Sequence, residues 1–188
     1  IRGVNRFGCA WPNRLEKMIN QLFGGDLVEV KAVGMGGTNS ATGATILEHD
    51  LLPTGAKNPD IIINAYSTND MHVITMRQAA SGNATLRDKV FDMTQDFVRE
   101  ALRPQSCKGV QQPLLLHMGD YLGNEQREIW STTELAQGVN VLANYYGFAS
   151  MSYADMVRDW VYGDTRESLF SPEGWYDGDV FSREIHPG

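Results

Sequence analysis

Glycine and small polar residues gather in one turn over residues 34–43, GMGGTNSATG, where a ligand could bind. Glycines there let the backbone approach a ligand closely. Three polar residues follow, any of which could cap a helix: Thr38, Asn39 and Ser40. N–H groups exposed at a helix start favour negative charge. The turn is not a dinucleotide fingerprint, because the third required glycine falls on Asn39, nor a phosphate loop, because no Gly-Lys-Ser/Thr follows. A tight turn that only caps a helix is the alternative interpretation.

A second polar turn, STND over residues 67–70, follows directly on the apolar run DIIINAY at residues 60–66. In open parallel sheets, ligands bind beyond the carboxyl ends of the strands. Both turns therefore stand where chemistry is expected. For STND, the structural alternative is an Asx-type turn that satisfies its own backbone.

The elements that must position these turns alternate between helix and strand. Apolar spacing predicts helices at residues 12–23, 44–52, 85–102 and 131–147, and apolar runs predict strands at residues 27–33, 60–66 and 113–118 and from residue 148. The run at residues 60–66 is expected to be covered on both faces. Pro12 suits a first helical turn, Ser131 and Glu134 predict a capping box, and Gly147 predicts a helix end. The pattern predicts one α/β domain over residues 1–188 with a mostly parallel sheet.

Composition restricts the partners and the compartment. A net charge of -7 without a Lys/Arg cluster argues against nucleic acid, so a neutral or weakly charged substrate fits better. No apolar run reaches the roughly 20 residues that span a bilayer. Cys9 and Cys107 match no metal-ligand spacing, and a disulfide and two free thiols both remain open. The glycosylation sequon at Asn83 favours a secreted or lumenal protein.

Three motifs in order resemble the SGNH hydrolases, also called the GDSL esterase and lipase family. They are VEVKAVGMGGTNS, PDIIINAYSTND about thirty residues later, and the tail FSREIHPG. The resemblance covers nearly the whole chain in order and spacing. It implies a flavodoxin-like fold, a three-layer sandwich with a mostly parallel sheet, and ester hydrolysis by a nucleophilic Ser without a cofactor or metal.

The resemblance also implies a role for each matching residue. The Gly37 backbone N–H and the Asn69 side-chain amide would stabilise the negative charge that grows on the ester carbonyl oxygen. His186 would take the Ser proton and return it to the leaving alcohol. The other histidines match no motif position and are interpreted as structural or solvated: His49, His72 and His117.

The tail departs from the family pattern at the residue that orients the base. Arg183 stands where the family carries Asp, and a guanidinium cannot accept the imidazole N–H. Glu184 is the favoured orienting acid, while Asp179 and a backbone carbonyl are the alternatives. In the STND turn, Ser67 replaces the family's Gly and leaves Asn69 in place.

The predicted substrate contacts come from the glycine turn and from the tail. Gly36 and Thr38 flank Gly37 in the first turn. Trp175 could stack on a sugar ring or simply cap the core.

The family's nucleophile lies in a Gly-Asp-Ser motif at the end of the first strand, and nothing from Ile1 to Trp11 supplies it. The first strand and the last helix are therefore expected to be missing from this chain. A separate segment or chain would supply this strand, between residues 27–33 and 60–66, together with the Ser. In the alternative, IRGVNRF folds back as the strand, but its residues suit a buried central position poorly. Two functions fit: an esterase or deacylase of carbohydrate or lipid esters, and a non-catalytic carbohydrate- or ester-binding module that has lost the Ser.

Overall fold

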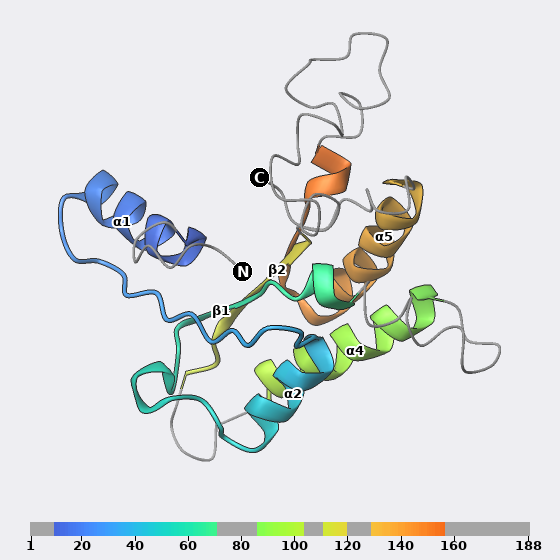
Figure 1. Cartoon of the computed structure of the whole chain (residues 1–188), viewed down its shortest axis with the longest axis horizontal. Coiled ribbons are helices and arrows are strands. Elements are labelled where there is room, and N and C mark those ends of the chain that lie inside the picture. Colours follow the sequence, from blue (N-terminus) through green and yellow to red (C-terminus); the bar gives the residue numbers. More distant parts are fainter. Residues whose placement is uncertain (1–9, 71–85, 104–110, 120–128, 157–188) are drawn as a thin grey trace, which may run out of the picture. The chain divides into compact units, whose positions relative to one another are not determined.

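The structure is a computed structural model that describes residues 10–70, 86–103, 111–119 and 129–156 (Figure 1). Its elements in chain order are α1 (Trp11–Phe23), α2 (Ser40–Glu48), a short 3-10 helix (Thr54–Ala56), β1 (Ile61–Asn64), α4 (Leu86–Ala101), β2 (Leu114–Gly119), α5 (Ile129–Tyr146) and β3 (Ala149–Ser152). They belong to two compact units. The first comprises the described residues up to Gly37 together with Leu52–Lys57, and the second comprises Thr38–Leu51 and the described residues from Asn58 onwards.

Helix α1 dominates the first unit and confirms the helix predicted at residues 12–23. Pro12 lies in its first turn, as predicted, where a missing N–H costs nothing. The helix ends at Gly24, whose φ of 73° is left-handed.

The strand predicted at residues 27–33 is wrong. Val28 donates its backbone N–H to Asn20 Oδ1 at 2.9 Å. Val30 donates its N–H to Glu16 Oε2 at 2.7 Å. Side chains of α1 thus take backbone groups that a neighbouring strand would have to bind, and residues 27–33 join no described strand.

The second unit contains a parallel sheet in the order β1-β2-β3. Ile61 pairs with Leu114, and Leu116 pairs with Ala149. Helix α4 lies in the connection between β1 and β2, and α5 lies in the connection between β2 and β3. The predicted α/β class with a parallel sheet is therefore confirmed for the described strands. Among them, β2 is the only neighbour of β1.

The two faces of this sheet differ in cover. One face carries Leu115, which packs in a core with Ala44 of α2 and Phe97, Val98 and Ala101 of α4. Side chains on the opposite face are open: Ile61 is 55% exposed, Leu114 is 70% exposed and Met151 is 45% exposed. Of the cover predicted for both faces of residues 60–66, the described helices α2 and α4 provide one face, the Leu115 side.

The end of α5 was predicted more accurately than its start. Gly147 ends the helix with a φ of 73° and donates its N–H to the Ala143 carbonyl at 2.8 Å. The capping box of Ser131 with Glu134 is wrong, because α5 begins at Ile129 and both residues lie inside it. Acidic residues also suit the first turn of a helix, so the Ser-x-x-Glu pattern does not fix the cap.

Two helical glycines give a matched test of the packing. A Cβ on Gly43 of α2 would stand 2.7 Å from Tyr66 Cε2 and 2.8 Å from Phe97 Cδ2, whereas on Gly138 of α5 the nearest atom, Phe91 Cδ2, is 3.9 Å away. We expect Gly43→Ala to destabilise the fold, because overpacking costs about 1–3 kcal/mol. Gly138→Ala is expected to stabilise it by about 0.5–1 kcal/mol. Urea unfolding measures both. Equal stability of the two variants would show that the rings move aside freely.

Candidate functional site

The second unit brings residues 38–43 of the first polar turn to the STND turn at the carboxyl end of β1. The Asn69 side chain donates an N–H from Nδ2 to the Thr38 carbonyl oxygen at 2.6 Å. Residues 67–70 form a helical turn in which Asp70 donates its backbone N–H to the Tyr66 carbonyl at 2.8 Å. The Asx-type alternative for STND is not observed, since Asn69 binds Thr38 rather than its own backbone.

A buried carboxylate stabilises this contact between the two turns, which we call the joint. Asp70, 1% exposed, accepts the Ser40 backbone N–H at Oδ1 and the Ser40 hydroxyl at Oδ2, both at 2.6 Å. Asn64 at the end of β1 donates to Ser40 Oγ at 3.1 Å. Ser40 is the first residue of α2, so the negative carboxylate lies at the positive end of a helix dipole. These contacts fix the start of α2 against the turn that carries Asn69.

The cap of α2 comes from Asn39. Its side chain accepts the Thr42 N–H at 3.0 Å. The prediction that a residue of the first turn caps a helix is confirmed. Because Asn39 is the cap, Thr38 lies outside the helix, and its carbonyl oxygen accepts the Asn69 side-chain N–H.

Asn69 keeps a donor for a ligand. A side-chain amide carries two N–H groups, and the bond to Thr38 uses one of them. The residue is only half-buried. Asn69 can therefore be held in place by Thr38 and still donate to a bound oxygen atom.

Tyr66 lies beside this joint and supports it. Its ring packs edge-on against Phe97, with ring centroids 6.2 Å apart. Burial raises the pKa of the Tyr66 phenol; the hydrogen bond with the Thr38 side chain acts in the opposite direction, and the Asp70 charge raises the pKa further. The phenol is therefore protonated at neutral pH.

Gly37 belongs to the first unit, directly before Thr38 in the chain. Its φ of 77° lies in the left-handed region that favours glycine. No atom lies within 4 Å of the place that a Cβ would take, so backbone conformation rather than crowding favours glycine here. Gly36 and Gly37 form an exposed turn.

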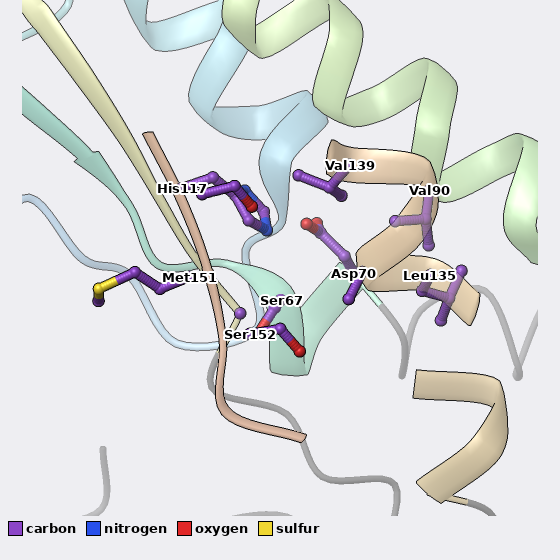
Figure 2. A pocket seen from close by; sticks show the side chains of 11 residues that line it. Ser67, Asp70, Val90, His117, Leu135, Val139, Met151 and Ser152 are labelled. Carbon is purple, nitrogen blue, oxygen red and sulfur yellow. The ribbon is translucent and has the colours of Figure 1, made fainter. Parts of the chain in front are cut away.

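A cavity of about 40 Å³ lies behind the Ser67–Asp70 turn (Figure 2). Its apolar wall comes from Val90 of α4 and from Leu135 and Val139 of α5. Its polar lining consists of Ser67, Asp70, His117, Ser150 and Ser152. The cavity is too small for a substrate and large enough for water.

His117, which the sequence analysis interpreted as structural or solvated, is a buried residue of β2. It is 5% exposed, and its Nδ1 has no hydrogen-bond partner in the described structure. Burial lowers the pKa of its imidazole from the usual 6.5 to about 4, so the ring is neutral at pH 7. The signal in the sequence was a lone histidine inside the apolar run PLLLHM, in step with the buried Leu115.

The remaining predicted site residues lie outside the described residues: Trp175, Asp179, Arg183, Glu184 and His186, with Cys9, His72, Asn83 and Cys107. The described side chains include no group of three or more His, Cys, Asp or Glu placed to hold a metal ion. None of the described helices is both long and apolar enough to cross a membrane. No protein-family model, no curated protein and no solved structure matches this chain.

Proposed function

We propose that this chain is part of an SGNH-type serine ester hydrolase, an esterase or deacylase acting on carbohydrate or lipid esters. The observation that carries the proposal is the hydrogen bond from Asn69 to the Thr38 carbonyl, which joins the two turns that the family resemblance assigns to the oxyanion hole. Asp70 and Ser40 reinforce the joint with two further bonds of 2.6 Å. Rigid donors of this kind are what ester hydrolysis needs, because they cost no reorganisation when charge develops.

The proposed chemistry has two steps. The nucleophilic Ser attacks the ester carbonyl carbon, its proton passes to His186, and the carbonyl electrons form an oxyanion. The second N–H of Asn69 binds that oxyanion, while Glu184 orients His186. The backbone N–H of Gly37 is the further donor that the family resemblance implies. The C–O bond to the alcohol then breaks, and His186 returns the proton to the alcohol. Water repeats the sequence on the acyl-enzyme to release the acid.

The nucleophile in this proposal is carried by a segment outside these 188 residues. That segment would pair as a parallel strand with β1, on the side away from β2, and its end would present Gly-Asp-Ser. One observation supports this arrangement: β2 is the only described neighbour of β1. An open edge of this kind is a template for another strand. Helices on the open sheet face would complete the three-layer sandwich of the flavodoxin-like fold.

Covalent labelling of the full-length protein tests the proposal. A fluorophosphonate is expected to label one Ser, and mass spectrometry should map it outside the 188 residues; a chromogenic short-chain ester should be hydrolysed by the same protein. His186→Ala should abolish both signals, whereas the exposed His49→Ala should keep them. If the full-length protein shows no turnover and no labelling, the proposal is wrong. Ester or glycan binding without labelling would instead identify a non-catalytic binding module.

A further inference from the structure

Thr38 is hydrogen-bonded through both its backbone and its side chain. Its carbonyl oxygen accepts the Asn69 side-chain N–H at 2.6 Å, and its side chain shares a hydrogen bond with the Tyr66 hydroxyl. Thr38 precedes the cap residue Asn39, so it lies outside α2 and is not held by the bonds of that helix. The two bonds form a continuous chain from Tyr66 through Thr38 to Asn69.

Tyr66 is itself held at its backbone and at its ring. Its N–H donates to Asn64 Oδ1 at 3.1 Å, and its carbonyl accepts the Asp70 N–H at 2.8 Å. The ring lies edge-on to Phe97, with centroids 6.2 Å apart, and a Cβ on Gly43 would stand only 2.7 Å from Tyr66 Cε2. Because packing already restricts the ring, the bond between the Tyr66 hydroxyl and Thr38 costs little further entropy.

The direction of the Asn69 amide depends on where the Thr38 carbonyl lies. A donor stabilises an oxyanion best when it is already aimed at the developing charge, because no reorganisation is then needed. A carbonyl that moves would carry the bonded amide with it. The bond to Tyr66 restricts Thr38, and it therefore restricts the second N–H of Asn69 as well.

We propose that Tyr66 is a positioning residue for Asn69: its hydroxyl holds Thr38, and through Thr38 it fixes the direction in which Asn69 presents its second N–H. The importance of this direction for catalysis rests on the proposed ester hydrolysis. The alternative is that the Thr38 hydroxyl merely satisfies the half-buried phenol, with no consequence for Asn69.

Kinetics of Tyr66→Phe in the full-length protein test the catalytic consequence. The variant removes only the hydroxyl and keeps the ring that packs against Phe97. We expect kcat for a chromogenic ester to fall roughly tenfold with KM unchanged, less than for Asn69→Ala, because the donor is misdirected rather than removed. Tyr146→Phe is the matched control, since its hydroxyl bonds Gln95 and Arg99 instead, and its kcat should not change.

A double variant separates positioning from a purely structural role. In the Asn69→Ala background, Tyr66→Phe is expected to cause no further loss of kcat, because the donor that Tyr66 positions is already absent. A second loss of the same size would show that Tyr66 acts elsewhere. That result would overturn the inference and leave the ester-hydrolase proposal intact.

Nuclear magnetic resonance of the Asn69 side-chain amide gives a readout that needs no turnover. Tyr66→Phe and Thr38→Val remove the same hydrogen bond from opposite ends, so both should shift the two Asn69 amide proton signals, whereas Tyr146→Phe should not. If Tyr66→Phe does not fold, Thr38→Val alone decides. Unshifted signals would overturn the inference, even in a protein that hydrolyses esters. Shifted signals in a protein without turnover or labelling would support the positioning and refute the ester-hydrolase proposal.

Discussion

Replacing Asn69 by Ala in the full-length protein is expected to lower ester turnover roughly a hundredfold or more, because one oxyanion donor is worth about 3–4 kcal/mol. The fold should survive. The variant loses the bond to the Thr38 carbonyl, worth about 1 kcal/mol, while Asp70 still holds Ser40 through two bonds. The expected loss falls on kcat, since the oxyanion exists only after attack. Steady-state kinetics with a chromogenic ester measure it.

The control for this variant is Asn144→Ala, which removes an exposed amide on α5. Its kcat is expected to equal that of the unaltered protein, and its urea midpoint is expected to rise slightly, because Ala is a better helix former than Asn. Asn69→Ala should keep a cooperative unfolding transition, which separates lost chemistry from lost structure. Unchanged turnover in Asn69→Ala would defeat the oxyanion assignment.

Acidification from pH 7 to pH 5 is expected to destabilise the fold by about 2 kcal/mol through His117 alone. The pKa of His117 is about 4 in the folded protein and near 6.5 in the unfolded chain. Between these values the unfolded chain binds more protons, so stability rises with pH. The contribution is fully present above pH 6.5, is lost as the pH falls toward 4, and then stays constant. Urea unfolding at a series of pH values measures this slope.

Two histidine variants isolate the effect. His117→Gln should flatten the slope between pH 7 and pH 5, whereas the exposed His49→Gln should leave it unchanged. Asp70 is the other titratable side chain among the described residues that line the cavity, and the apolar wall contributes no charge. If His117→Gln does not fold, titration of the His117 ring-proton signals in the unaltered protein measures the pKa directly. A His117 that titrates near pH 6.5 would contradict the prediction.

The sequence predicted well where structure depends on local pattern. Helix α1, strand β1 and the end of α5 at Gly147 follow from apolar spacing and from glycine's preference for positive φ. The meeting of the two turns was expected because both were predicted to follow parallel strands. Only the second turn follows a described strand, and the bonds of Asp70 to Ser40 and of Asn69 to Thr38 bring the turns together.

Features that depend on distant partners could not be predicted in this way. The run at residues 27–33 has strand-like residues, yet Asn20 and Glu16 of α1 bind its backbone instead. The cover of β1 depends on which helices pack on each face, and no local pattern of Ile61 reports that. The environment of His117 is built by β2, α4, α5 and the Ser67–Asp70 turn together. Its burial follows from tertiary packing alone.

The bond between Ser40 and Asp70 also bears on the order in which the chain folds. The two residues are 30 positions apart, and the loop between them encloses only α2, the short 3-10 helix and β1. Closing a loop of this length costs little more entropy than closing a much shorter one. Contacts of such modest sequence separation form readily in a folding nucleus. Pairing of β2 with β3 spans a similar separation, whereas pairing of β1 with β2 spans a longer one. We therefore infer that α2 joins the turn after β1, and β2 joins β3, before β1 pairs with β2.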